Sequence, residues 1–500
     1  MPRVFISDKL EAGGVEMLEH AGLEVDNHPG LKDAELQEAM RAADGMVVRS
    51  GTRVTSQLLE NPGRLRAIVR AGVGVDNIDV PAATRKGIVV MNTPGGNTVS
   101  TAELTISHLM SLARHLPEAD ATMRQGKWER SKLTGTQLAG KTLGIEAAAD
   151  LDSLLPRCDF LTVHTPLTAE TTDLIGARQL ARMRKGSRVI NCARGGIINE
   201  AALAEALKSG HIAGAALDVF VDEPPSADHP LLKLPNVELT PHLGASTTEA
   251  QESVALEAAQ LLIDFLTRGV IQFAVNVAPV DRAELQEIRL YVDLARRLGL
   301  LHAQMCQGSI KRAELHYRGE VARRSTRLIT AAFAAGLLEY RLAEQVNIVN
   351  AELLARERGI DIVEQISPKK GDFSTLVHAE VVTDKKSYIA AGTLFGNQFL
   401  RVVQIGPYRL DTYIDGILLV FTHRDVPGLI GYIGTIFGKH QVNIAQMTVG
   451  RQLPGGEAIA VLNLDSDPPE EALKEVRSHP QISSLSVVKL PPAGEMPAWF

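Results

Sequence analysis

The chain is poor in cysteine and lacks long apolar or basic runs. Its three cysteines, Cys158, Cys192 and Cys306, are widely spaced and form no CxxC pair, which predicts a reducing compartment and no structural metal site. No uncharged apolar run approaches the roughly 18 residues of a membrane span. The net charge of −7 comes with no long basic run, which argues against nucleic acid or an anionic membrane as the main partner. The start, MPRVFISDKL, has no apolar signal-peptide core. We therefore expect a cytoplasmic protein.

A chain of 500 residues is too long for one hydrophobic core and predicts several domains. From Arg3 to about Asn92, short apolar runs alternate with amphipathic stretches such as Ala34–Ala42, a pattern typical of βαβ units on a parallel sheet. A long helical segment, Thr98–Glu129, then leads into a second α/β series, which the helix Thr247–Thr267 closes. The strand candidates of this series are KTLGI, DFLTVHTP, SRVINCARG, AGAALDVF and NVELTPHLG.

The character of the sequence changes after AVNVAPV, which ends at Val280. A region of mixed helix and strand runs to about Asp415. From Ile417 the pattern reads strand, helix, strand, strand, helix, strand, the order of a ferredoxin-like unit.

Residues that can carry chemistry follow predicted strands of the second α/β series. Arg194 lies in CARGG, Asp218 and Glu223 lie in LDVFVDEPP, and His242 lies in TPHLGAST. Open α/β sheets bind their ligands at this edge. An arginine can hold a carboxylate there, while a histidine oriented by a glutamate takes a hydroxyl proton. Any one of them alone is more often an ordinary loop residue, but the three in this order favour a site for oxidising an alcohol beside a carboxylate.

Several long strings give the chain a resemblance to a known family: VRSGTRVT, RAGVGVDNIDVPAATRKGIVVMNTPGGNTVSTAEL, GKWER, VINCARGG, AGAALDVFVDEPP and TPHLGAST. It resembles the long-form D-3-phosphoglycerate dehydrogenases among the D-2-hydroxyacid dehydrogenases. The resemblance implies NAD-dependent oxidation of 3-phosphoglycerate to 3-phosphooxypyruvate, the first step of L-serine biosynthesis. It makes Arg194, Glu223 and His242 the catalytic residues.

The resemblance also implies the fold class and the domains. The fold is α/β, with a flavodoxin-like substrate-binding domain (1–97 and 268–280) and a truncated Rossmann-type NAD-binding domain (98–267). An α+β intervening domain (281–415), which contains GTLFGNQFLRVVQIGPYRLD, and a ferredoxin-like ACT domain (416–490) follow.

Further binding residues are carried over by the same resemblance. The nicotinamide half of NAD is expected at Thr165, Cys192, Ala193, Arg194, Asp218, His242, Gly244 and Ala245. The phosphoglycerate is expected at Arg49, Ser50, Arg70 and Asn97, with Arg130 contributing from a neighbouring subunit. In the ACT domain, THRDVPGLIG and HQVNIAQM place His423, Asp425 and Asn443 where family members bind L-serine. A homodimer or homotetramer is expected, paired through Thr98–Glu129 and through the ACT domains.

One element that a dinucleotide-binding protein needs is missing. The predicted strand Lys141–Ile145 runs into EAAAD, and no G-x-G-x-x-G occurs anywhere in the chain. In the strand order 3-2-1-4-5-6, loss of strands 2 and 3 leaves 1-4-5-6 as a continuous sheet, with strand 1 as an exposed edge. The glycine loop supplies two or three charge-assisted hydrogen bonds to the pyrophosphate, together worth about 4–8 kcal/mol. Its absence predicts NAD binding weakened on the order of a thousandfold or more.

Three readings follow from this gap. The chain is a phosphoglycerate dehydrogenase, or a non-catalytic homologue that acts as a serine-sensing or partner subunit, or the product of a deletion or a sequence error in an ordinary dehydrogenase gene. The retained Arg/Glu/His set favours the first and the third, whereas the absent loop favours the second and the third.

Overall fold

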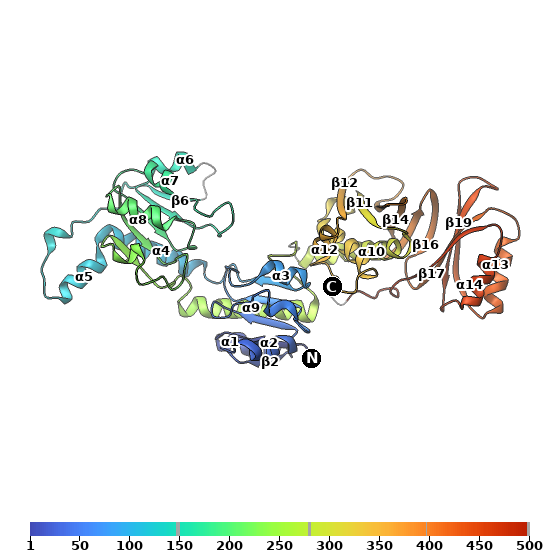
Figure 1. Ribbon diagram of the computed structural model, residues 1–500, viewed down its shortest axis with the longest axis horizontal. Coiled ribbons are helices and arrows are strands. Elements are labelled where there is room, and N and C mark those ends of the chain that lie inside the picture. Colours follow the sequence, from blue (N-terminus) through green and yellow to red (C-terminus); the bar gives the residue numbers. More distant parts are fainter. Residues whose placement is uncertain (147–150, 279–281, 397, 498–500) are drawn as a thin grey trace.

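A computed structural model describes residues 1–146, 151–278, 282–396 and 398–497. Within these residues the chain forms four β-sheets, each with helices of its own (Figure 1). The overall α/β class therefore agrees with the sequence prediction. Among the described residues, no helix is both long enough and apolar enough to cross a membrane.

The first sheet is parallel, with the order β2-β1-β3-β4-β5. This is the flavodoxin-like order that was expected. Strand β2 was not predicted, because it is an edge strand whose one apolar residue, Val25, gives no strand pattern. The elements are β1 (Arg3–Ile6), α1 (Ala12–His20), β2 (Glu24–Asn27), α2 (Asp33–Ala42), β3 (Gly45–Val48), β4 (Ala67–Arg70), α3 (Val80–Arg85) and β5 (Val89–Asn92).

The helix α9 (Thr248–Arg268) packs on this first unit, although the sequence analysis assigns Thr247–Thr267 to the second. Its residues from Val254 to Leu266 share one core with β1 and β4. Against α1 the approach is close, because a Cβ at Gly14 would lie 2.8 Å from the Ala255 carbonyl oxygen. The sequence shows that this helix has an apolar face, but not which sheet that face covers.

The helical segment predicted over Thr98–Glu129 is two helices rather than one, α4 (Thr98–Arg114) and α5 (Leu116–Arg124). His115 between them has a φ of 53°, in the left-handed region. Pro117 follows in the first turn of α5, where its missing N–H costs no helical hydrogen bond. The break directs α5 away from the body of the molecule (Figure 1).

The second sheet is parallel, with the order β10-β9-β8-β7-β6. All five predicted strands are present, and β6 forms an edge as expected, with Leu143 and Ile145 exposed at 38% and 53%. Its elements are β6 (Leu143–Glu146), α6 (Leu151–Leu154), β7 (Phe160–Val163), α7 (Ala177–Arg182), β8 (Ser187–Asn191), α8 (Glu200–Lys208), β9 (Ile212–Leu217) and β10 (Val237–Leu239).

The third sheet is mixed and has the order β12-β11-β13-β14-β15-β16. The long helices α10 and α11 pack together against it. The elements are α10 (Arg282–Met305), β11 (Ile310–Gly319), α11 (Arg327–Glu339), α12 (Ala351–Glu357), β12 (Asp361–Ser367), β13 (Thr375–Thr383), β14 (Ser387–Phe395), β15 (Phe399–Ile405) and β16 (Tyr408–Tyr413).

The fourth sheet is antiparallel, with the order β18-β19-β17-β20. The predicted βαββαβ order is confirmed. Its elements are β17 (Ile417–Arg424), α13 (Leu429–Lys439), β18 (Ile444–Arg451), β19 (Glu457–Leu464), α14 (Glu470–Arg477) and β20 (Ile482–Lys489).

A buried arginine connects this fourth unit to the third. Arg297 of α10 pairs with Asp293, 2.7 Å away. It also donates to the carbonyl oxygens of Ile414, before β17, and of Pro491 and Pro492, after β20. Both chain connections of the fourth unit are therefore held by one side chain.

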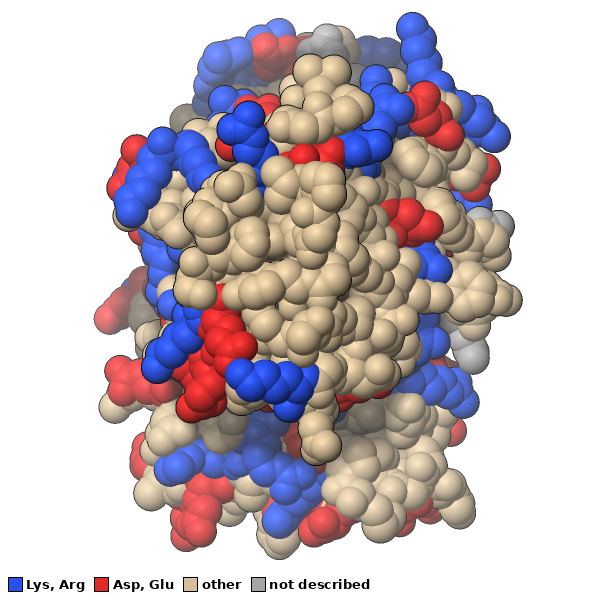
Figure 2. Space-filling view, turned by 90° about the vertical axis from the view of Figure 1, so that its right-hand side faces the viewer, with Lys and Arg blue, Asp and Glu red and all other residues tan. Residues whose placement is uncertain are grey.

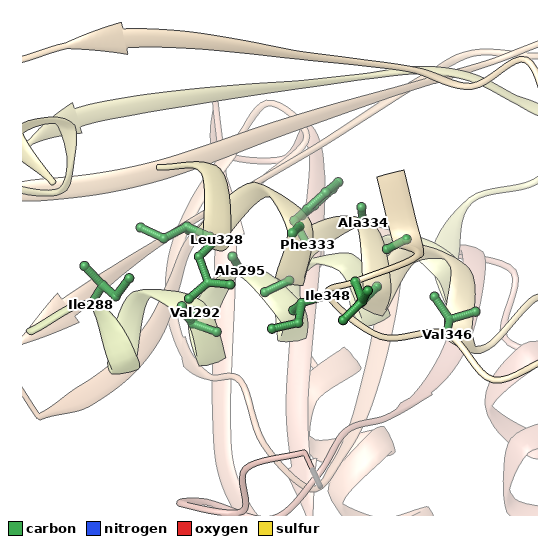
Figure 3. Packing of buried hydrophobic residues seen from close by; sticks show 14 of the residues in the cluster. Ile288, Val292, Ala295, Leu328, Phe333, Ala334, Val346 and Ile348 are labelled. Atoms are coloured by element: carbon green, nitrogen blue, oxygen red, sulfur yellow. The ribbon is translucent and has the colours of Figure 1, made fainter. Parts of the chain in front are cut away.

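The contact between α10 and α11 depends on two facing glycines. Figure 3 shows Val292 and Ala295 of α10 beside Leu328 and Phe333 of α11. A Cβ at Gly299 would lie 2.2 Å from the Phe333 carbonyl oxygen, and one at Gly336 would lie 2.1 Å from that of Arg296. The helices are close enough that neither glycine has room for a side chain.

We predict that Gly336→Ala lowers the stability of the third unit by about 1–3 kcal/mol, because the added methyl overlaps backbone rather than a movable side chain. Gly434→Ala in α13 is the matched control, since its Cβ would meet nothing within 4 Å, and it should stabilise slightly. Guanidinium unfolding midpoints measure both. Equal shifts in the two variants would contradict the packing argument.

We also predict a pH dependence that arises from His302 of α10. Full burial lowers the pKa of His302 to about 4, against about 6.5 in an unfolded chain. The unfolded state therefore binds the extra proton first, and stability that is present above about pH 6.5 is lost as the pH falls toward 4. In His302→Gln the unfolding midpoint should fall less between about pH 7.5 and about pH 5 than in the parent. An identical fall would rule His302 out as the cause.

Candidate active site

Three neighbouring strands of the second sheet supply the predicted catalytic residues. Arg194 follows β8, Glu223 follows β9 and His242 follows β10. The carboxyl ends of parallel neighbours meet at one edge, which brings the three loops together. Arg194 reaches the first unit as well, because its Nε donates to Asp76 Oδ2 over 2.9 Å.

The structure brings His242 and Glu223 into direct contact. His242 Nδ1 lies 2.7 Å from Glu223 Oε2, and Glu223 Oε1 accepts the backbone N–H of Phe220 over 3.0 Å. The carboxylate is thus fixed at both oxygens, and it contacts one of the two ring nitrogens of His242. Beside the pair is a cavity of about 400 Å³, with mainly apolar lining residues that include Phe220, Pro224, Leu232 and Leu239.

Asp218, predicted to contact the cofactor, organises the turn that carries His242. Its buried carboxylate accepts the Thr240 hydroxyl (2.6 Å) and the backbone N–H groups of Leu243 (2.7 Å) and Gly244 (2.8 Å). His242 adopts a φ of 54° in this turn, a conformation that costs free energy unless neighbouring contacts enforce it. Sequence reasoning did not identify this role.

Helix α4 supports the same turn from a second direction. Ser100 and Thr101 donate their hydroxyls to the Gly244 carbonyl oxygen over 2.6 and 3.1 Å. His108 Nε2 lies 3.2 Å from the Thr240 hydroxyl. These partners come from a segment more than 130 residues away in the chain, so no local sequence signal identifies them.

Positive charge gathers where the first unit faces Arg194. The Nε of Arg70 is buried without a hydrogen-bond partner. Desolvation, reinforced by Arg194 and then Arg49 and opposed by Asp76, lowers the pKa of Arg70 to about 10. Arg70 remains positively charged at neutral pH, and an anionic ligand would supply a negative partner for its buried guanidinium.

Two glycines make room for these guanidinium groups. A Cβ at Gly72 would lie 1.8 Å from Arg70 Nη1, and one at Gly74 would lie 1.7 Å from Arg194 Nη2. Gly72 also has a φ of 149°. The two glycines of the RAGVG string thus leave bare backbone against which the guanidinium groups of Arg70 and Arg194 lie.

The other predicted substrate residues vary in position. Arg49 is anchored by its backbone N–H to Asp8 Oδ2 (2.6 Å) and by its Nη1 to the Lys9 carbonyl oxygen (3.1 Å). Ser50 is exposed next to it, and Asn97 precedes α4 without capping it through its side chain. Arg130 is exposed in a turn beyond α5. Within the described residues, Arg130 makes no hydrogen bond to the other predicted substrate residues.

The predicted nicotinamide residues fit the role by position. Thr165 follows β7, while Cys192 and Ala193 follow β8. Burial raises the pKa of Cys192 to about 11, so it is a neutral thiol. Asn191, which the sequence analysis missed, shapes this turn by accepting the Ala193 N–H (3.0 Å) and donating to the Arg194 carbonyl oxygen (2.8 Å). Ala245 follows Gly244 in the His242 turn.

The predicted effector residues in the fourth unit are not in mutual hydrogen-bond contact within the described chain. His423 is buried, and its Nε2 has no hydrogen-bond partner. Asp425 pairs with Arg451 over 2.6 Å, which holds the pKa of that carboxyl below its usual range. Asn443 donates to Asp465 over 2.6 Å.

Family models match three parts of the chain. Residues 146–244 match the NAD-binding domain of D-isomer specific 2-hydroxyacid dehydrogenases. Residues 287–406 match the D-3-phosphoglycerate dehydrogenase intervening domain, and residues 417–481 match the ACT domain.

Curated relatives extend this likeness to nearly the whole chain. A D-3-phosphoglycerate dehydrogenase of Methanocaldococcus jannaschii is 38% identical, covering 98% of this chain and 100% of its own. One from Bacillus subtilis is 37% identical with the same coverage.

This chain belongs to the D-3-phosphoglycerate dehydrogenase family.

Among solved structures, an NAD-dependent formate dehydrogenase from Staphylococcus aureus in complex with NAD matches with a TM-score of 0.50 and 28% identity. The match covers 56% of this chain and 100% of that chain. NAD is thus the cofactor of the family, and the chain is classed with the NAD-dependent oxidoreductases. These comparisons do not support the non-catalytic alternative. The alignment with the archaeal relative runs over 528 positions, more than this chain's 500 residues, so that relative has residues with no counterpart here.

The cofactor fits this chain in one half only. The residues expected at the nicotinamide end are present and held in defined turns. The sequence after β6 offers no glycine loop for the pyrophosphate. Residues 147–150 of that segment lie outside the described residues.

We predict that Gly74→Ala weakens binding of a carboxylate substrate about 10–100-fold, which corresponds to one charge-assisted hydrogen bond. The new methyl would overlap Arg194 Nη2 and Asp76 Oδ2, which are ends of flexible side chains. The side chains should move while the fold survives. A KM measurement for the 2-hydroxyacid tests this, with Gly371→Ala, in open space, as the control. An unchanged KM would show that Arg194 is not confined by Gly74.

Proposed function

We propose that this chain oxidises 3-phosphoglycerate to 3-phosphooxypyruvate with NAD, the first step of L-serine biosynthesis. The observation that carries the proposal is the His242–Glu223 pair on the loops after β9 and β10, next to the β8 loop whose Arg194 acts electrostatically on Arg70 of the first unit. The substrate name comes from the relatives, and the charges at the site support it. A molecule with a carboxylate and a phosphate complements an arginine on each side of the site.

The residues divide the work by position. Arg194 holds the carboxylate, for which its planar guanidinium is suited. Arg49 and Arg70, with Ser50 and Asn97, hold the phosphate. This arrangement leaves the C2 hydroxyl between the two anionic groups, where His242 can reach it.

Proton transfer falls to His242. Its Nε2 removes the proton from the C2 hydroxyl as the carbonyl forms, and the hydrogen on C2 leaves as hydride. Glu223 at Nδ1 holds the ring in position and stabilises the imidazolium that results. When bound, NAD supplies the acceptor for the hydride.

The ACT unit points to an amino-acid effector, and we propose L-serine. His423, with its unpartnered buried nitrogen, Asp425 and Asn443 would contact it. Figure 2 shows that the end of the molecule formed by this unit presents a broad face without charged residues. Ile430, Tyr432 and Leu453 are among the exposed apolar side chains of the unit. We propose that a second copy of the chain covers this face and completes the effector site.

The α4–α5 arm supports a second contact between copies. Ile106, Met110, Leu116 and Met123 are each at least half exposed, and Trp128 is 80% exposed. So much apolar surface on a projecting arm is typical of an interface. In such an assembly, Arg130 would enter the substrate site of the partner subunit.

We predict that His242→Ala lowers the turnover number for 3-phosphoglycerate by about 10²–10⁴-fold, as expected for loss of a general base. Glu223→Gln, which keeps the hydrogen bond from Phe220, should cost about tenfold or more in turnover. Neither change should alter serine binding, measured by calorimetry, because the ACT unit is a separate sheet. Retained turnover in His242→Ala would overturn the mechanism.

A further inference from the structure

The two ends of the second sheet differ in what they can offer a dinucleotide. After β8, β9 and β10, the loops expected to face the nicotinamide are held by hydrogen bonds, within the β8 loop and between the β9 and β10 loops. At the opposite edge β6 is the last strand of the sheet in the part of the chain that is described. Within the described residues, no further strand there carries an acidic residue for the adenosine ribose.

The connection from β6 to β7 has no glycine loop that would hold a pyrophosphate. Residues 147–159 contain no glycine and one basic residue, Arg157, and the string EAAAD at 146–150 has two acidic residues. The helix α6 has only four residues and ends in a 3-10 turn, Leu155–Arg157. So short a helix has little dipole to attract an anion.

Three arginines packed near this connection already have partners. Arg178 and Arg182 of α7 lie 2.9 and 2.8 Å from the Asp152 carboxylate. Arg184 donates to the Pro156 carbonyl oxygen over 2.9 Å and lies 3.7 Å from Asp159. A phosphate that bound these three arginines would have to replace the partners that they already have.

We propose that this chain recognises the nicotinamide mononucleotide half of its cofactor and gains almost nothing from the adenosine half. The inference rests on the proposed function, since it assumes a nicotinamide beside His242. Reduced nicotinamide mononucleotide, NMNH, then binds within about tenfold of NADH, whereas a complete pyrophosphate loop would separate the two by on the order of a thousandfold.

The test is a titration of the full chain with NADH and, separately, with NMNH, followed by the fluorescence of the reduced nicotinamide. The expected result is a Kd for NMNH less than about ten times the Kd for NADH, and millimolar ADP-ribose should not displace NADH. This quotient, Kd of NMNH over Kd of NADH, is the Kd ratio. A ratio of about one hundred or more, or displacement by micromolar ADP-ribose, overturns the proposal. So does failure of both nucleotides to bind at millimolar concentration.

The double variant Arg178→Ala/Arg182→Ala gives a matched control, because these are the charged groups that a misplaced pyrophosphate would use. Its Kd ratio should equal that of the parent, and a ratio that falls from a high value toward one would overturn the proposal by revealing a substitute phosphate site.

Oxidation of 3-phosphoglycerate with saturating NAD, and separately with oxidised nicotinamide mononucleotide, separates the two claims. Turnover with NAD but not with the mononucleotide sinks the cofactor inference and leaves the function standing. A binding ratio near one without turnover from either nucleotide upholds the inference and overturns the function.

Discussion

The buried carboxylate of Asp218 is the interaction on which the active site depends. It accepts hydrogen bonds from Thr240, Leu243 and Gly244, and so joins the end of β9 to the turn after β10. A buried carboxylate needs several donors to offset its desolvation, and these donors are the residues that surround His242. The left-handed backbone of His242 lies within this arrangement, and the His242 ring contacts Glu223.

Where the first unit meets Arg194, the site carries more positive than negative charge. Arg194 and Arg49 both act electrostatically on Arg70, and Asp76 is the acid that pairs directly with Arg194. Gly72 and Gly74 let this charge lie against bare backbone. A dianionic or trianionic substrate would relieve the repulsion, so binding and charge neutralisation become one event.

The second sheet shows how a parallel sheet tolerates loss at one edge. Hydrogen bonds in a sheet join neighbouring strands only, so β6 to β10 pair continuously without any strand beyond β6. The catalytic loops follow β8, β9 and β10, far from the shortened edge. The loss has two local effects. Apolar side chains of β6 are exposed, and the part of the cofactor that would lie over β6 has fewer protein contacts.

The sequence alone predicted the strands of the second sheet, the βαββαβ unit and the Arg194, Glu223 and His242 set, because apolar periodicity and position after a strand are local properties. It also revealed the missing glycine loop. Only the tertiary structure decided that α9 covers the first sheet, that Asp218 braces the His242 turn and that Asp76 pairs with Arg194 across the two units. It likewise set the close contact of Gly299 and Gly336. Each of these depends on partners distant in the chain, and a pattern within one segment carries no information about which distant surface it will meet.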